Sequence, residues 1–304
     1  MIITTENQLK DYFERLRQKN IRKIALDMEG DQGMFHYHYS ISIIQCFDGV
    51  EAVVIDVLKM GCNDTLREFL TCRDVTKIMF SCGNDIFMAQ NVLGCTIAPI
   101  NDIAVAQKLL GLPINLASYL GIDKVQKDGF QRANWLIRPI KPALLEYAVN
   151  DVLKLLDIES GFAAQLEEKG LYDDYIVSSR AASDRCYAVD PHTLFATKFP
   201  GYARLSPEKK RLAAALWIFR ELLGEKFDCP VGYIMPKKEL AAILGNSGGN
   251  NLAAALEREI NRNRKPHKRL SGKLIQELFE KAAASPHIPA LKSKHGRGTR
   301  KPAP

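Results

Sequence analysis

The sequence predicts an α/β domain, a mixed sheet with flanking helices, followed by a small all-α domain. Three observations support this prediction. Within the first 170 residues, short apolar runs alternate with segments of helical periodicity, which is typical of a sheet covered by helices. From about residue 205 only helical patterns remain. The 304 residues include 46% hydrophobic and 25% charged residues, which is ordinary for globular protein and leaves room for two domains.

The first domain is expected at residues 1–170. A capping box at Thr5-Glu6-Asn7-Gln8 begins its first helix, and Asp48-Gly49 is a hairpin signal between two strands. Strands are expected at 21–27, 39–47, 51–57 and 75–80. Further helices are expected at 63–70, at 84–94 with Asn84 as the cap, at 101–110, and as one long helix at 142–168.

The second domain is expected at residues 205–285. Ser206-Pro207 is a helix start signal, with Ser at the N-cap and Pro at the first helical position. Helices are expected at 208–226, 236–244, 251–260 and 271–284. Weak periodicity predicts a connector at 171–204, and composition predicts a basic, disordered tail at 286–304.

Charge is distributed unevenly along the chain. The formal net charge is +7, yet residues 262–304 alone hold twelve Lys or Arg against two Glu, a net +10, so the rest of the chain is mildly acidic. A basic end favours a polyanion such as nucleic acid, although it fits a solubilising tail equally well.

Cysteine use and hydropathy bear on the compartment. The seven cysteines are scattered and form no C-x-x-C pair, which predicts reduced thiols and a cytoplasmic location. No apolar run reaches the length of a membrane span and the start lacks a signal peptide, so no membrane contact is expected. No motif indicates an obligate protein partner.

Four acids and a tyrosine are the candidate catalytic residues. Asp27 and Glu29 are two apart on an expected strand and so share a face, and Asp85 follows another expected strand. Tyr147 and Asp151 are four apart on an expected helix and also share a face. Each could be an ordinary surface or cap residue. Together they predict a site for two divalent cations, Mg²⁺ or Mn²⁺, which cleaves phosphodiesters.

These residues lie in segments that resemble a known family. Leu26–Glu29 with Ser42–Gln45, Lys77–Asp85, and Asn134–Pro139 continuing to Tyr147–Val152 resemble the motifs of DEDDy 3′–5′ exonucleases, within them ribonuclease D. The region after Leu205 resembles the helicase-and-ribonuclease-D C-terminal (HRDC) module, which binds nucleic acid. The resemblance implies a ribonuclease H-like sheet and an enzyme that trims single-stranded 3′ ends of structured RNA, such as tRNA precursors, to nucleoside 5′-monophosphates.

The resemblance also implies a role for each residue. Asp27 would bridge both ions, Glu29 and Asp151 would hold the ion with the nucleophilic water, and Asp85 would serve the second ion largely through water. Tyr147 would orient the attacking water.

The chain departs from the family at three positions. Phe80, Asn134 and Leu144 stand where ribonuclease D proteins often carry His, Asp and Gln. None of these positions is a metal ligand in the family. Two alternatives remain open: a DNA exonuclease of the same fold, and an RNA-binding adaptor without catalysis, although the complete set of acids speaks against the adaptor.

Several residues are candidate nucleic-acid contacts. His36 and Tyr37 follow the first motif and could stack on a base, or they could form a partly buried strand edge. Arg138 could contact phosphate or pair with a nearby acid. A basic cluster between two expected helices could contact the RNA backbone: Arg262, Arg264, Lys265, Lys268 and Arg269.

Overall fold

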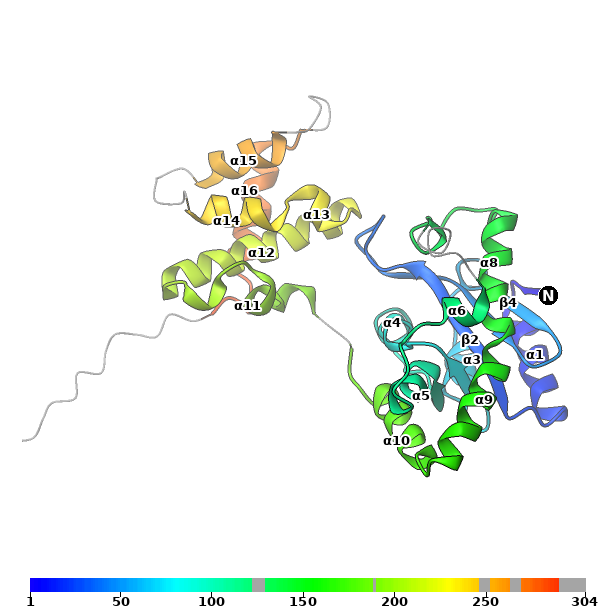
Figure 1. The fold of residues 1–304 in the computed structure, drawn as a ribbon. Coiled ribbons are helices and arrows are strands. Elements are labelled where there is room, and N and C mark those ends of the chain that lie inside the picture. The colour runs from blue at the N-terminus through cyan, green and yellow to red at the C-terminus, as the bar shows by residue number, and fades with distance from the viewer. Residues whose placement is uncertain (122–128, 188–189, 246–251, 263–268, 290–304) are drawn as a thin grey trace, which may run out of the picture. The chain divides into compact units, whose positions relative to one another are not determined.

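The computed structural model describes residues 1–121, 129–187, 190–245, 252–262 and 269–289. The chain divides into two compact units, Met1–Val189 and Asp190–Pro304 (Figure 1). The expected connector at 171–204 is therefore wrong as a single segment. Helix α10 (Tyr172–Ser183) buries Tyr175 in the core of the first unit, whereas α11 (Phe195–Lys198) buries Phe195 in the core of the second. The boundary between the two units is set by the different cores that α10 and α11 contact, which sequence periodicity does not show.

A mixed sheet forms the centre of the first unit, as predicted, and it has six strands where the sequence predicted four. Its order is β1-β4-β3-β2-β5-β6. β3 pairs antiparallel with both β2 and β4, whereas β1 runs parallel to β4, and β2, β5 and β6 run parallel to one another. The strands are β1 (Ile2–Ile3), β2 (Lys23–Asp31), β3 (Ser40–Phe47), β4 (Ala52–Asp56), β5 (Thr76–Met79) and β6 (Ile100–Asp102).

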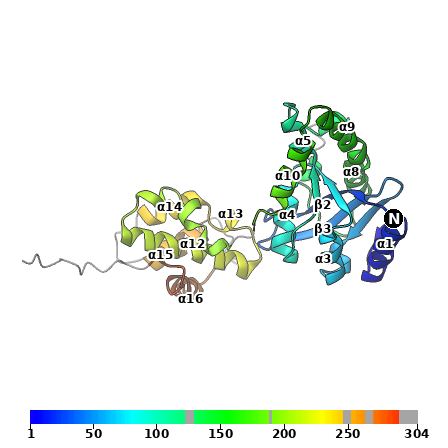
Figure 2. The same ribbon diagram turned by 90° about the horizontal axis from the view of Figure 1, so that it is seen from below.

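Helices cover both faces of this sheet. In Figure 2, α1 and α3 lie on one side of the strands, and α5, α8 and α9 lie on the other. The predicted capping box begins the first helix, because the Thr5 side chain accepts the Gln8 N–H and the Gln8 side chain accepts the Thr5 N–H. The helices are α1 (Glu6–Gln18), α2 (Val57–Met60), α3 (Asp64–Thr71), α4 (Gly83–Met88), the π-helical η1 (Ala89–Leu93), α5 (Ile103–Leu109), α6 (Ala117–Leu120), α8 (Pro142–Leu153) and α9 (Leu155–Glu168).

Alternation along β2 decides where its acids point. Ile24 and Leu26 are buried against the core that includes α1 and α3, whereas Ala25 is buried against the core that includes α5 and α9. Because successive side chains of a strand point to opposite faces, Asp27 and Glu29 share the face of Ala25. The acids of β2 therefore face the layer of α8 and α9.

Three expected helices differ in the structure. The helix expected at 101–110 begins after a short strand, because the Asp102 side chain caps α5 by accepting the Ala104 N–H. The long helix expected at 142–168 is broken at Lys154, since α8 packs on β2, β3 and β4 while α9 packs on β2 and β5. Asn84 is not a cap: α4 begins at Gly83, which places Asp85 in its first turn.

The second unit is helical, as predicted. Its centre is α12 (Pro207–Phe227), in which every residue from Ala213 to Gly224 is buried. The helices around it include α13 (Val231–Ile234), α14 (Lys237–Gly245), α15 (Leu252–Asn261) and α16 (Gly272–Ala283).

The disordered tail expected at 286–304 is wrong for its first four residues, 286–289. Ile288 packs against the core of the second unit, and the Pro289 carbonyl accepts a hydrogen bond from Arg211. The rest of that segment, from residue 290, lies outside the described residues. None of the helices in the described part of the chain has the length and apolar character needed to cross a bilayer.

A close backbone contact fixes the end of β2. The pairing register with β3 shifts between Glu29 and Gly30, and a Cβ atom at Gly30 would lie 2.1 Å from the carbonyl oxygen of Ser40. We therefore expect Gly30→Ala to lower the free energy of unfolding by about 1–3 kcal/mol, as overpacking does. Chemical denaturation measures this change.

Gly161 provides the control for Gly30. It lies in α9, and a Cβ atom there would meet nothing within 4 Å. We expect Gly161→Ala to raise stability by about 0.5–1 kcal/mol, since glycine is a poor helix former. Equal effects of the two substitutions would contradict the close contact at Gly30.

Candidate active site

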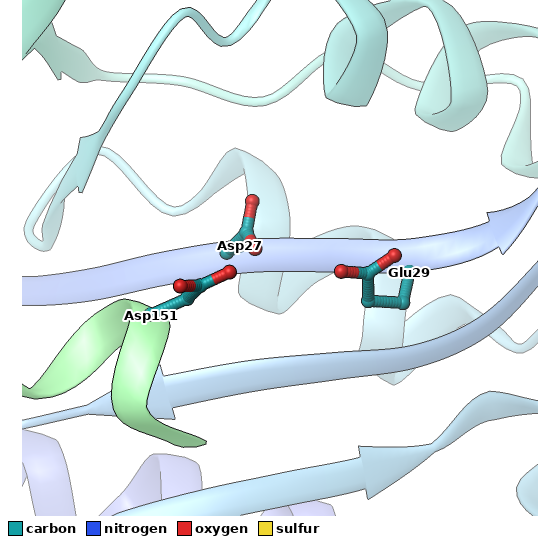
Figure 3. Close-up of side chains that lie close together, drawn as sticks. All are labelled: Asp27, Glu29 and Asp151. Carbon is teal, nitrogen blue, oxygen red and sulfur yellow. The ribbon is translucent and has the colours of Figure 1, made fainter. Parts of the chain in front are cut away.

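Three carboxylates converge at the centre of the first unit. Asp27 and Glu29 come from β2 and Asp151 from α8, and ligand oxygens of all three lie within 4.8 Å of one another. Figure 3 shows the carboxylates of Asp151 and Glu29 turned toward each other, with Asp27 on the same strand as Glu29. Two secondary structure elements far apart in sequence thus bring together three of the four predicted acids.

Asp85 approaches the same strand from α4. Its side chain is buried and hydrogen-bonds the backbone of Met28, between the two β2 acids. Burial raises the pKa of Asp85 well above its usual value, and the nearby Asp27 carboxylate raises it further. Asp85 lies outside the three-carboxylate cluster, but it is close enough to Asp27 for their charges to interact.

Tyr147 lies one helical turn before Asp151, and both side chains are buried. Its ring stacks on Phe130 at 4.9 Å between centroids and lies 6.4 Å from the ring of Trp135. Burial raises the pKa of the Tyr147 hydroxyl above its usual range, and the Asp151 carboxylate raises it further. The hydroxyl therefore stays protonated beside the acids, where it can donate a hydrogen bond.

Gln45 fixes the orientation of Asp27. The two residues are opposite each other in the β2–β3 ladder, and Gln45 Nε2 donates to Asp27 Oδ2 at 2.9 Å. Gln45 is fully buried, so the amide has little freedom to move. The sequence places Gln45 in a motif but gives it no role, because the register of the ladder depends on the shift at Gly30.

Asp102 holds the turn that leads to Asp85. Its carboxylate accepts the backbone N–H groups of Ser81 at 2.7 Å and Cys82 at 3.2 Å. Ser81 has φ +57°, a conformation that side chains disfavour, so these bonds stabilise a turn that would otherwise be costly. The sequence does not reveal this role, because its periodicity predicts Asp102 to lie inside a helix.

A pocket of about 470 Å³ opens beside Glu29 and Asp85. Part of its wall comes from residues 32–38, the pocket loop, in which Met34 and Phe35 are 44% and 37% exposed. These two apolar side chains are a candidate surface for a base, and no sequence motif had indicated them. The pocket is also lined by Gly30, Gln32, Asn84, Gln131 and Ala133.

Asp31, the last residue of β2, holds the beginning of the pocket loop in place. Its carboxylate is buried and accepts the backbone N–H groups of Met34 at 2.7 Å and His36 at 2.8 Å, as well as that of Phe35. Burial by itself would raise the pKa of Asp31, but the hydrogen bonds from the Met34 backbone and from His36 are stronger in sum, and the pKa is lowered. Asp31 therefore stays ionised and fixes the loop.

His36 and Tyr37, the predicted base contacts, lie in this loop but are not among the pocket-lining residues. His36 Nδ1 lies 3.0 Å from Asp31 Oδ2, and the ring of Tyr37 packs edge-on against His38. Their neighbours Met34 and Phe35 line the pocket instead.

Arg138 pairs with a nearby acid, which is one of the two roles that the sequence left open, and its phosphate contact stays a prediction. Its guanidinium makes a bidentate pair with the buried Asp56, at 2.8 and 3.0 Å. Its remaining N–H groups donate to Ser42 and to the carbonyls of Trp135 and Ile137. All five donors of a guanidinium are thus occupied.

The basic cluster lies in the second unit. Arg262 and Arg269 are exposed, and paired hydrogen bonds between the side chain of Asn261 and the backbone of Leu270 bring the two ends of this segment together. Arg262 also pairs with Glu259 at 3.0 Å. The other three predicted contacts, Arg264, Lys265 and Lys268, lie outside the described residues.

The residues at the convergence suit hard divalent cations. The ligand atoms that Asp27, Glu29 and Asp151 offer are carboxylate oxygens, which Mg²⁺ and Mn²⁺ prefer. The negative charges of Asp85 and Asp27 repel each other, and a bound cation would offset this repulsion. The three clustered side chains include no Cys or His, the ligands that favour zinc or other softer metals.

Comparison with known proteins identifies the first unit. A family model described as 3′–5′ exonuclease matches residues 1–167, which is more than half of the chain. The chain belongs to the 3′–5′ exonuclease family. The matched exonuclease region includes all four acids and Tyr147. Members of this family depend on divalent metal ions.

Similar proteins with curated names include ribonuclease D of two bacteria. The chain is 29% identical over 175 residues to that of Xanthomonas oryzae, covering 55% of this chain and 46% of the relative. It is 28% identical to that of Escherichia coli, covering 56% and 45%. It is also 25% identical over 262 residues to the exosome complex exonuclease RRP6 of Saccharomyces cerevisiae, covering 80% and 35%. The chain thus spans about half or less of the length of these relatives.

Solved structures show the same fold. The Escherichia coli RNase D structure superposes with a TM-score of 0.75 at 24% identity, covering 94% of this chain and 76% of that one. The catalytic core of RRP6 from Trypanosoma brucei superposes with a TM-score of 0.72 at 19% identity, covering 92% and 79%. The fold of the exonuclease family is therefore present together with the converging acids.

The buried charge of Asp85 predicts a pH-dependent stability in EDTA. Because its folded-state pKa is raised above 3.8, its stabilising contribution is complete below that pH and is lost as the pH rises through the folded-state pKa. Relative to Asp85→Asn, we expect the natural protein to lose about 1.4 kcal/mol of unfolding free energy for each unit by which the pKa is raised. Urea unfolding from about pH 4 to about pH 8 measures this difference.

The control for Asp85 is Asp157→Asn, which changes an exposed carboxylate on α9. Its stability curve should run parallel to that of the natural protein. If the stability curve of Asp85→Asn is also parallel to that of the natural protein, the charge of Asp85 is not destabilised by burial or by Asp27.

The hydrogen bonds of Asp31 predict the rigidity of the pocket loop. An asparagine side chain offers one acceptor oxygen in place of two, so Asp31→Asn removes charged hydrogen bonds worth about 1.5–3 kcal/mol each. We expect the Met34, Phe35 and His36 amides to exchange with deuterium roughly tenfold to a hundredfold faster. Asp48→Asn is the matched control, because Asp48 accepts the Val50 and Glu51 N–H groups in a different turn. Unchanged exchange in Asp31→Asn would contradict this role.

Proposed function

We propose that the protein is a metal-dependent 3′–5′ exoribonuclease that hydrolyses RNA from its 3′ end and releases nucleoside 5′-monophosphates. The observation that carries this proposal is the convergence of Asp27, Glu29 and Asp151 within 4.8 Å, with Asp85 and the protonated Tyr147 beside them. Ribonuclease D and RRP6 among the similar proteins support RNA as the substrate.

The acids would hold two divalent cations, Mg²⁺ or Mn²⁺. Such ions activate a water molecule and stabilise the leaving oxygen in an in-line displacement. Asp27 is suited to contact both ions because it belongs to the three-carboxylate cluster and also interacts with the charge of Asp85. Gln45 would keep its carboxylate oriented.

Tyr147 would orient the attacking water. Its hydroxyl is protonated and buried next to Asp151, so it can donate one hydrogen bond and accept another. Phe130 and Trp135 hold the ring in place. This role needs no change in the charge of Tyr147.

The pocket beside Glu29 and Asp85 would take the 3′-terminal nucleotide. Its volume suits a small ligand, and the exposed Phe35 could stack on a base without sequence preference. The rigid pocket loop would keep this surface at a constant distance from the acids, which limits hydrolysis to the terminal unit.

The second unit would add affinity for RNA. We assign it to the HRDC type on its helical fold, and Arg262 and Arg269 could contact phosphates on the body of a structured RNA such as a tRNA precursor. The cytoplasmic location expected from the cysteine pattern stays a prediction.

Degradation of a 5′-labelled RNA with a single-stranded 3′ end tests the proposal. We expect shortening from the 3′ end with Mg²⁺ or Mn²⁺, and no shortening with EDTA or in Asp27→Asn. A DNA strand of the same sequence identifies the preferred sugar. Intact RNA under every metal, with the RNA still retarded on a gel, would leave an RNA-binding adaptor instead.

Tyr147→Phe separates orientation of the water from metal binding. We expect kcat to fall on the order of a hundredfold, because a mispositioned reactant costs about that much. Added Mn²⁺ should raise the melting temperature of this variant as much as that of the natural protein, because the four acids that would bind the ions are unchanged. Tyr119→Phe is the control, because Tyr119 is 42% exposed and should leave kcat unchanged. Equal kcat in the two variants would exclude a role for the Tyr147 hydroxyl.

A further inference from the structure

A second pocket, of about 390 Å³, lies at the other end of the parallel strands. Lys23, Thr76 and Ile100 begin β2, β5 and β6, and all three line this pocket together with residues of α10. Asp27 lies four residues further along β2, which corresponds to about 13 Å. This amino-end pocket is therefore separate from the site of the converging acids.

Buried polar groups form the inner part of the amino-end pocket. Glu159 is fully buried behind it and accepts hydrogen bonds from Lys23 Nζ at 2.9 Å and Asn101 Nδ2 at 2.7 Å. Ser183 is 3% exposed, and its hydroxyl has no hydrogen-bond partner among the described residues. A buried hydroxyl without a partner is costly, so a ligand that pairs with it gains affinity.

Three basic side chains line the pocket, of which Lys23 is paired with the buried Glu159. Lys23, Arg73 and Arg180 line it against a single acid, Asp184, which lies 3.8 Å from Arg180 in an exposed pair. Within the described residues, Arg73 is exposed and makes no ion pair. Since exposed pairs are weak, the guanidinium groups of Arg73 and Arg180 are available to an anion such as a phosphate.

The remaining wall is apolar. Pro99, Ile100 and Ile176 line it, and Tyr172 contributes an aromatic ring that packs edge-on against Tyr175. A purely inorganic anion would leave this surface without contacts. A ligand with a flat, apolar ring system and an anionic group would use both parts of the pocket.

We propose that the amino-end pocket binds a nucleotide unit, with its base against Tyr172 and Ile176 and its phosphate at Arg73 and Arg180. The Ser183 hydroxyl pairs with a polar atom of the base or sugar. The same chemistry has two sources: a free nucleoside 5′-monophosphate, or one unit of an RNA strand that extends beyond the active site.

Calorimetric titration of full-length Asp27→Asn protein with adenosine 5′-monophosphate in EDTA tests this proposal without catalysis. We expect saturable binding that weakens about tenfold in the added Arg73→Gln background, because a charged hydrogen bond is lost. Adenosine and inorganic phosphate should each bind more weakly than the nucleotide. Arg22→Gln is the matched control, because Arg22 is an exposed arginine that adjoins the pocket residue Lys23 but does not line the pocket. The nucleotide affinity of this variant should be unchanged.

Ser183→Ala tests the same site with little risk to the fold. It removes a buried hydroxyl that has no partner among the described residues, so stability should be kept while nucleotide affinity falls severalfold. The proposal would be overturned if no saturable binding is seen. It would also be overturned if Arg73→Gln, Ser183→Ala and the protein without either change bind the nucleotide with equal affinity.

A 3′-phosphorylated RNA oligonucleotide distinguishes the two sources. Displacement of the mononucleotide by this RNA, together with weaker RNA binding in Arg73→Gln, would assign the pocket to the RNA strand. Retention of the mononucleotide in the presence of the RNA would assign it to the free nucleotide. Because catalysis is absent from these measurements, their outcome is independent of the exoribonuclease assay.

Discussion

Mutual repulsion between acids on and beside β2 is the constraint on which the exonuclease unit depends. Asp27, Glu29 and Asp151 converge from two elements, and Asp85 is buried against the backbone of the same strand. Like charges at such distances would move apart if the surrounding backbone and side chains were flexible. The surrounding structure therefore acts as a frame that keeps the acids together before any cation binds.

The frame is made largely of hydrogen bonds to neighbouring residues. Gln45 holds Asp27 across the ladder, and Asp102 holds the turn before Asp85. Asp31 holds the pocket loop on the side of Glu29. Each of these groups is buried, so its bond is strengthened by the low dielectric of the interior. Precision at the site thus depends on residues that never need to touch RNA.

Local signals in the sequence were sufficient for most elements and for the acids. The hairpin at Asp48-Gly49 and the start signal at Ser206-Pro207 are set by neighbouring residues, and both are found in the structure. Long-range packing decided the rest. The break at Lys154 follows from two helices that share β2 but extend over different neighbouring strands, and Arg138 pairs with Asp56, 82 residues away in the chain. Gln45 was missed for the same reason, because its role depends on strand register.

The break at Lys154 has a consequence for the directions in which the two halves of this segment point their side chains. Tyr147 and Asp151 lie in α8, whereas α9 carries Glu159 toward the opposite end of the sheet. In a continuous helix, a rotation of either half would turn the other by the same angle. The interruption at Lys154 lets the two halves take different rotations, so Tyr147 and Asp151 can face the site while Glu159 faces Lys23 and Asn101.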